Sequence, residues 1–168
     1  IELSLGSVNK LWKEMEEKEY IKKGLLSEKG KEALAPYKVE NAMIMAAGKG
    51  TRFVPLTYEI PKGLLRVKGE VLIERQIEQL RKAGIHNITV VVGYMQEHFF
   101  YLEDKYDVKI VINTDYYRYN NTSTLMAVLE ELGNTYICSS DNYFVDNVFT
   151  PYVYEAYYAA QYATGTTG

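Results

Sequence analysis

Two patterns of apolar residues alternate along residues 39–145 of the chain. Short continuous runs of Val, Ile, Ala and Met are typical of strands that are buried on both faces, whereas apolar positions repeating every three or four residues are typical of helices with one apolar side. The expected strands are 42–47, 88–92, 108–112 and 136–139, and the expected helices are 70–83, 96–105 and 123–132. This alternation predicts an α/β fold, a Rossmann-like and mostly parallel sheet with helices on both faces.

Residues 1–38 follow a different pattern, and we expect a small appendage before a main domain of residues 39–168. Ser7 can N-cap a first amphipathic helix, and residues 27–34 predict a second, short one. The order of helix, Lys-Lys-Gly turn and helix resembles the second half of a winged helix. Its first helix would then contact DNA, but eight lysines against seven glutamates leave the segment nearly neutral. Because phosphate contacts dominate DNA affinity, this balance argues against DNA binding, which stays the alternative.

Composition narrows the classes of protein further. The net charge of −3 gives no global attraction to nucleic acid or to an anionic membrane. Cys138 is the only cysteine, so no internal disulfide can form, and its apolar neighbours predict a buried thiol. No apolar run reaches membrane-spanning length and no signal peptide is visible, which predicts a cytoplasmic protein. The chain starts without methionine and ends in Thr-Gly-Thr-Thr-Gly, so we expect a piece of a longer protein, truncated at its C-terminus.

A glycine-rich turn directly follows the first expected strand of the main domain. Gly48 and Gly50 allow a tight turn with outward N–H groups, which suits phosphate oxygens, and Arg52 and Lys62 add two positive charges. A dinucleotide fingerprint is excluded because Phe53 stands where its third glycine belongs, and a Walker loop is excluded because its four-residue spacer is missing. The segment therefore predicts a nucleoside triphosphate site.

The same segment carries a long, specific pattern, A-A-G-x-G-x-R-x-x-P-L-T-x-x-x-P-K, which is the signature of nucleotidyltransferases. The matching residues are Ala46, Ala47, Gly48, Gly50, Arg52, Pro55, Leu56, Thr57, Pro61 and Lys62. On these residues the chain resembles that superfamily.

Two polar segments after later strands point to one branch of it. Asp141, in Ser-Asp-Asn, directly follows a strand, where a carboxylate can meet hydrated Mg²⁺, although a turn cap is its simpler role. The segment Tyr119-Asn-Asn-Thr-Ser123 equally suits the start of a helix. Together with Val91-Val-Gly-Tyr94, these segments resemble the bacterial CTP:phosphocholine cytidylyltransferases. Sugar-1-phosphate nucleotidyltransferases usually carry Gly-Asp or Asp-Gly-Asp at the metal strand instead.

The resemblance implies Mg²⁺-dependent cytidylyl transfer from CTP to phosphocholine, giving CDP-choline and pyrophosphate. An ionised acceptor phosphate needs no general base, so the site must align the substrates and neutralise charge. The implied catalytic residues are Arg52 for the triphosphate and the departing pyrophosphate, Lys62 for the α-phosphate, and Asp141 for the metal. The implied nucleotide-binding residues are Ala46, Ala47, Gly48, Gly50, Thr51, Asn121, Thr122 and Ser123. The family places a second metal aspartate and much of the acceptor pocket beyond residue 168. The resemblance also implies an aromatic cage for the trimethylammonium group, and it leaves open which tyrosines form that cage.

Two other functions stay open at this point. One is a sugar-1-phosphate or polyol-phosphate nucleotidyltransferase that uses UTP, dTTP or CTP. The other belongs to a different class, a nucleotide-sensing regulator in which a degenerate transferase domain is coupled to a winged helix.

Overall fold

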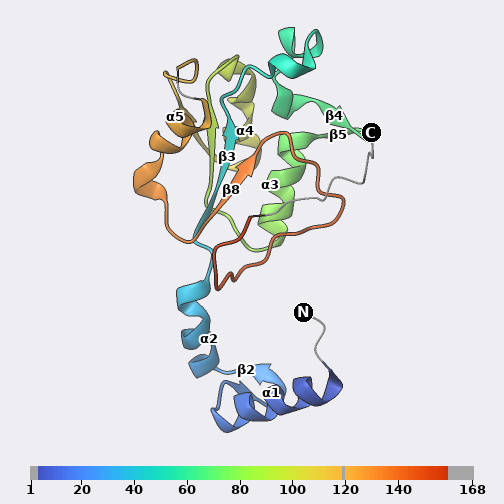
Figure 1. Cartoon of the computed structure of the whole chain (residues 1–168), viewed down its shortest axis with the longest axis vertical. Coiled ribbons are helices and arrows are strands. Elements are labelled where there is room, and N and C mark those ends of the chain that lie inside the picture. The colour runs from blue at the N-terminus through green and yellow to red at the C-terminus, as the bar shows by residue number, and fades with distance from the viewer. Residues whose placement is uncertain (1–3, 119, 159–168) are drawn as a thin grey trace, which may run out of the picture.

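The computed structural model describes residues 4–118 and 120–158, and it omits the side chains of Asn120 and Asn121. Four parallel strands form the central sheet in the order β7-β6-β3-β8 (Figure 1). The strands are β3 (Asn41–Ala46), β6 (Ile88–Val92), β7 (Lys109–Ile112) and β8 (Thr135–Ser139). The predicted α/β fold with a parallel sheet is confirmed, and each strand lies within one residue of its expected bounds.

Successive residues of β3 point to opposite faces of the sheet, as the pleat requires. Ala42 and Ile44 belong to the larger core, which also contains Ile77 of α3 (Leu72–Lys82) and Leu102 of α4 (Tyr101–Tyr106). On the other face, Met43 packs with Val91 and Val128. The elements on that face are α5 (Asn120–Met126) and the 3-10 turn η6 (Leu129–Glu131). Helical elements therefore cover both faces, and the face beneath α3 and α4 carries most of the core.

Several expected helix bounds are wrong, and for two of the helices the backbone shows a local reason. The helix expected from residue 70 begins at Leu72, because residues 66–71 form the hairpin of β4 (Arg66–Val67) and β5 (Glu70–Val71) around two positive-φ residues, Lys68 and Gly69. The helix expected over 96–105 is divided into the 3-10 turn η5 (Gln96–Phe99) and α4, after Met95 in a left-handed conformation. The helix expected over 123–132 begins three residues earlier and ends at Met126.

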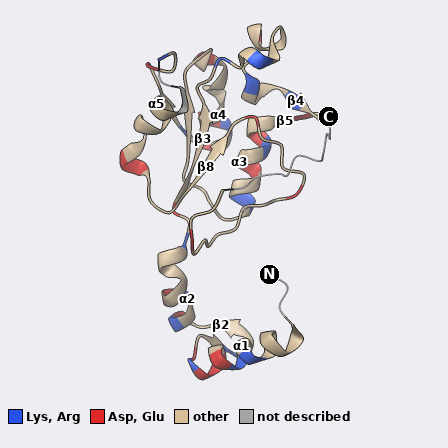
Figure 2. Ribbon diagram, in the orientation of Figure 1, with Lys and Arg blue, Asp and Glu red and all other residues tan. Residues whose placement is uncertain are grey.

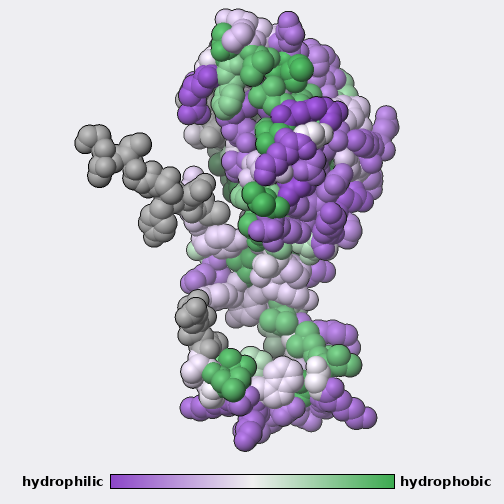
Figure 3. Space-filling model, turned by 90° about the vertical axis from the view of Figure 1, so that its right-hand side faces the viewer, coloured by the Kyte–Doolittle hydropathy of each residue, from purple (hydrophilic) through white to green (hydrophobic). Residues whose placement is uncertain are grey.

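The N-terminal segment consists of α1 (Leu5–Glu17), the hairpin of β1 (Ile21–Lys22) and β2 (Leu25–Leu26), α2 (Glu28–Leu34) and the 3-10 turn η1 (Ala35–Tyr37). Ser4, and not Ser7, caps α1, because the Ser4 hydroxyl accepts a hydrogen bond from the Ser7 N–H at 3.2 Å. Residues of α1 are nowhere buried, and α1 carries charges of both signs (Figure 2). Exposed apolar groups are visible on this segment (Figure 3). The winged-helix interpretation and the domain division at residue 38 stay predictions.

The described C-terminal residues return to residues 37–39, directly before β3. Val39 N–H donates to the Pro151 carbonyl at 2.9 Å, and Val153 N–H donates to the Tyr37 carbonyl at 2.7 Å. These bonds fix the start of β3 against the last described segment. Within the described residues, every helix is too short or too polar to cross a lipid bilayer.

Candidate active site

The carboxyl ends of the four strands meet at one edge of the sheet, and the loops that follow them contact one another there. Tyr94 N–H donates to the Ala47 carbonyl at 3.1 Å, and Ser140 N–H donates to the Met45 carbonyl at 3.1 Å. Open parallel sheets bind ligands at this edge. The structure thus brings the glycine-rich turn after β3 beside the segments after β6 and β8.

The glycine-rich turn is held by Thr57, which is buried and belongs to the 3-10 turn η3 (Leu56–Tyr58). Its hydroxyl donates to the Gly50 carbonyl at 2.9 Å. Gly50 has a positive φ of 63°, and a Cβ there would meet the Thr57 methyl group at 3.0 Å. Only glycine fits position 50 without strain, and the Thr57 hydrogen bond ties down the loop to which the backbone N–H groups of residues 48–51 belong. Ala46 and Ala47 are buried at its base.

Lys62 and Asp141 form an ion pair across this edge of the sheet. Lys62 begins the 3-10 turn η4 (Lys62–Leu64), and Asp141 follows β8. The next residue, Gly63, allows the close approach, because a Cβ there would lie 2.8 Å from Cβ of Ser140. Lys62 Nζ also lies 4.4 Å from the ring centroid of Phe53, in cation–π geometry. The two charges that the sequence assigned to one site are therefore in contact.

Two opposing effects act on the carboxyl group of Asp141. Burial alone would raise its pKa, but hydrogen bonds from Lys62 and Ser139 and the Lys62 charge outweigh burial, so the pKa lies below its ordinary value. The Ser139 hydroxyl donates to Oδ1, while Lys62 contacts Oδ2. Asp141 is therefore held ionised, the state in which a carboxylate can bind a cation.

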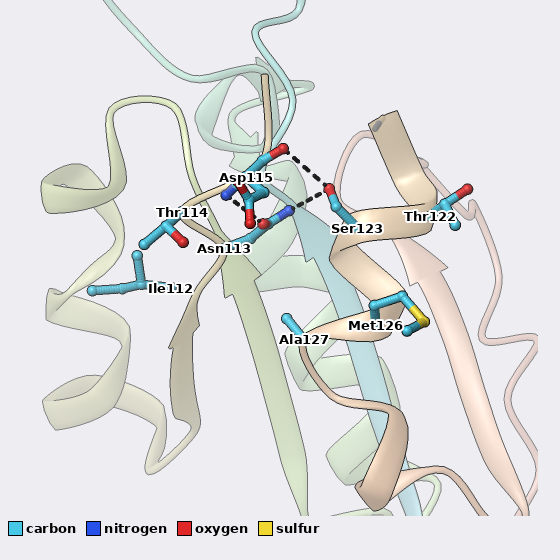
Figure 4. Close-up of a pocket in the computed structure, with 8 residues that line it drawn as sticks. All are labelled: Ile112, Asn113, Thr114, Asp115, Thr122, Ser123, Met126 and Ala127. Atoms are coloured by element: carbon cyan, nitrogen blue, oxygen red, sulfur yellow. Dashed lines mark hydrogen bonds between the residues drawn. The ribbon is translucent and has the colours of Figure 1, made fainter. Parts of the chain in front are cut away.

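A second polar cluster lies where β7 ends, beside α5 (Figure 4). Asn113 is buried, and its Nδ2 donates to Ser123 Oγ at 2.9 Å and to Thr124 Oγ1 at 3.2 Å, while its Oδ1 accepts from Asp115 N–H at 3.0 Å. A cavity of about 450 Å³ opens here, within the range of small-molecule sites (roughly 300–1,000 Å³). Its lining includes Thr122 and Ser123, both assigned to nucleotide binding from the sequence.

The remaining predicted residues are placed as follows. Arg52 lies exposed in the 3-10 turn η2 (Thr51–Phe53), and among the described residues no ion pair involves its guanidinium group. Thr51 begins the same turn. Asn121 lies in α5, but its side chain is outside the described part of the chain, as is Tyr119.

Sequence reasoning missed two buried amides near the site, Asn113 and Gln76. Asn113 directly follows the apolar run of β7, and that position was a usable signal. Gln76 stands within the apolar stripe of α3 and donates to backbone carbonyls 63 and 66 residues away. Nothing local in the sequence indicates such long-range partners.

Comparison with known proteins identifies the family to which the chain belongs. Residues 42–166 match the family described as the MobA-like NTP transferase domain. Because this match spans well over half of the sequence, the chain belongs to that family of nucleotidyltransferases.

Individual relatives narrow the similarity to cytidylyltransferases. The chain is 48% identical over 108 residues to a choline-phosphate cytidylyltransferase of Streptococcus pneumoniae, covering 64% of this chain and 47% of that protein. It is 42% identical over 132 residues to a 2-aminoethylphosphonate cytidylyltransferase of Lancefieldella rimae, covering 76% of this chain and 54% of that protein.

A solved structure of the Streptococcus pneumoniae CTP:phosphocholine cytidylyltransferase LicC superposes with a TM-score of 0.65 at 47% identity. The superposition covers 68% of this chain and 50% of that one. The chain spans about half the length of the curated relatives that it matches.

Proposed function

We propose that the chain forms the nucleotide-binding part of a cytidylyltransferase that transfers the cytidylyl group of CTP to phosphocholine, releasing pyrophosphate. The observation that carries this proposal is the contact of Lys62 with Asp141 beside the glycine-rich turn. It supplies a positive charge for phosphate and an ionised carboxylate for a metal at one point. The similarity to relatives named for cytidylyl transfer supports CTP as the donor.

Each residue has a distinct part in the proposed reaction. The N–H groups of residues 48–51 receive the triphosphate, and exposed Arg52 neutralises its distal charge. Lys62 exchanges its contact with Asp141 for the α-phosphate. A phosphate oxygen of phosphocholine then attacks the α-phosphorus while the bond to pyrophosphate breaks, and no proton has to be transferred. Thr122 and Ser123, with Ala46 and Ala47, line the nucleoside.

The residues present fit Mg²⁺ held jointly with the nucleotide. Within the described residues no cluster of three His, Cys, Asp or Glu side chains could hold a metal by itself. Magnesium in such sites commonly takes one or two carboxylates and completes its shell with substrate phosphates and water, so one ionised carboxylate at Asp141 is enough to begin it. Asp141 would hold Mg²⁺ there, and the ion would neutralise negative charge on the phosphates.

A second acceptor is favoured by one specific similarity, the 42% identity to the 2-aminoethylphosphonate enzyme. Phosphocholine and 2-aminoethylphosphonate both join an anionic phosphorus group to a cationic nitrogen by a two-carbon chain. The two differ in the ammonium group, which is quaternary only in phosphocholine, and at phosphorus, which is joined to the carbon chain through an ester oxygen in phosphocholine and directly in 2-aminoethylphosphonate. The same nucleotide site would serve either acceptor.

Calorimetric titration of the chain with CTP, UTP and dTTP, each with Mg²⁺, tests the donor. We expect selective CTP binding, with loss of the metal-dependent part in Asp141→Asn. Pyrophosphate release with phosphocholine, 2-aminoethylphosphonate or a sugar 1-phosphate then tests the acceptor. Preference for UTP or dTTP would refute the proposal in favour of a sugar-phosphate enzyme. Nucleotide binding without any transfer, in a form of the protein that spans the full length of its relatives, would favour a sensor.

A further inference from the structure

One buried side chain of α3 fixes both ends of the turn that carries Asp141. The carboxamide of Gln76 is fully buried, and its Nε2 donates to the carbonyl oxygens of Ser139 and Asn142, each at 2.8 Å. These two residues flank the Ser140–Asp141 pair. Both N–H groups of a single amide are thus used on the turn.

The other end of the same amide shows why an amide stands there. Gln76 Oε1 is buried and has no hydrogen-bond partner among the described residues. An unpaired buried acceptor costs free energy, and an apolar side chain of similar size would avoid that cost. Such a side chain would, however, remove the donors to Ser139 and Asn142. The two N–H groups are therefore what this position supplies.

The next turn of α3 offers a matched comparison. Gln79 is also buried, and its Oε1 is likewise unpartnered. Its Nε2 donates at 3.0 Å to the carbonyl of Phe144, beyond the turn. The two glutamines have the same side chain, are both buried and belong to the same helix. They differ in the backbone carbonyls to which they donate, which belong to the turn around Asp141 for Gln76 and to a later residue for Gln79.

We propose that Gln76 is a positioning residue that holds Asp141 in the geometry for binding a divalent cation together with the nucleotide. This inference rests on the proposed function. Gln76 acts through Ser139, whose carbonyl it binds and whose hydroxyl donates to Asp141 Oδ1. Fixing Ser139 and Asn142 fixes the backbone on both sides of the carboxylate, so its oxygens need no reorganisation when the cation arrives.

The test compares Gln76→Met with Gln79→Met by titrating CTP calorimetrically with and without Mg²⁺. Loss of a group that orients a metal ligand typically costs roughly 10–100-fold in metal affinity, so we expect Gln76→Met to weaken Mg²⁺-dependent binding about tenfold. Metal-free CTP affinity should stay unchanged. Gln79→Met should leave both affinities unchanged, although each variant will unfold at lower urea concentration.

A double-mutant cycle separates positioning from packing. In an Asp141→Asn background, Gln76→Met should cause no further loss of Mg²⁺-dependent binding, because its only route to the metal has been removed. The inference would be overturned if Gln76→Met and Gln79→Met lost Mg²⁺-dependent CTP binding equally. It would also be overturned if Gln76→Met weakened that binding as much in the Asp141→Asn background as in the wild type. If Gln76→Met does not fold, Gln76→Asn retains the amide but is too short to reach both carbonyls, and it replaces Gln76→Met in the same comparison.

The outcomes also separate the two proposals. A wild-type chain that binds no Mg²⁺–CTP would refute the proposed function and the role of Gln76 with it. A wild-type chain that binds Mg²⁺–CTP, together with a Gln76→Met variant that binds it equally well, would refute the positioning role alone.

Discussion

Replacing Lys62 by methionine tests the ion pair at the centre of the candidate site. The side chains of Lys62 and Asp141 are 19% and 24% exposed, so the pair is mostly but not fully withdrawn from water. Methionine keeps much of the apolar stem and removes only the charge. A hydrogen bond to a charged group contributes about 1.5–3 kcal/mol, and we expect Lys62→Met to lower the free energy of unfolding by about 2 kcal/mol near neutral pH.

The loss of folding stability in Lys62→Met should depend on pH in a defined direction. The folded-state pKa of Asp141 lies below its ordinary value of 3.8, so its ionisation stabilises the wild type above that value, and this contribution is lost as the pH falls through the folded pKa. In Lys62→Met, burial and the Ser139 hydrogen bond still act on Asp141 while the hydrogen bond and charge of Lys62 are gone, so the pKa of Asp141 is higher than in the wild type. The difference in stability between wild type and variant should therefore be largest at neutral pH and shrink in acid.

Urea unfolding at about pH 7 and about pH 3 measures this difference, and Asp141→Asn provides the partner for a double-mutant cycle. We expect a coupling free energy between the two positions at neutral pH that falls in acid. Zero coupling at neutral pH, or a loss of equal size at both pH values, would show that the contact does not stabilise the folded chain and would refute the reasoning.

Three further predictions concern other parts of the fold. Gly63→Ala should destabilise the chain by about 1–3 kcal/mol in urea unfolding, because the new Cβ would lie 2.8 Å from Cβ of Ser140. Gly48→Ala is the control and should be tolerated, because no atom lies within 4 Å of its Cβ. Equal losses of stability in the two variants would contradict the close approach. Arg52→Ala should weaken CTP binding at least tenfold, about 1.4 kcal/mol, in a calorimetric titration, and unchanged affinity would remove Arg52 from the site. Burial raises the pKa of the Cys138 thiol to about 12, so a thiol reagent should label it only after unfolding, and rapid labelling of the folded chain would contradict its burial.

Much of the fold could be read from the sequence, because its strands are continuous apolar runs. All five residues of β6 are buried, and its predicted bounds were correct to the residue. The hairpin of β4 and β5 was missed because two-residue strands are too short to show any periodicity. The start of α5 was misplaced because Asn120 to Ser123 are all suited to a helix cap, so composition alone does not locate the first turn.

For the candidate site, the sequence identified the charged residues but not what holds them. Lys62 and Asp141 stand in recognisable motifs, and the parallel order of the strands brings them together. The contribution of Gln76 depends on carbonyl groups more than sixty residues away, which no motif or local pattern reports. The need for glycine at position 63 likewise became clear only from the structure, in which Ser140 lies close to Gly63.

The order of the strands also has a consequence for synthesis of the chain. The central strand β3 lies between β6 and β8, and its first residue, Asn41, is hydrogen-bonded to Thr135, 94 residues later. The glycine-rich turn therefore leaves the ribosome long before β8 and Asp141 exist to complete its surroundings. Contacts so distant along the chain form late and slowly. We expect the candidate site of the growing chain to be the last part of the sheet to become protected from proteases. Nucleotide added during translation should increase that protection only after residue 141 has emerged.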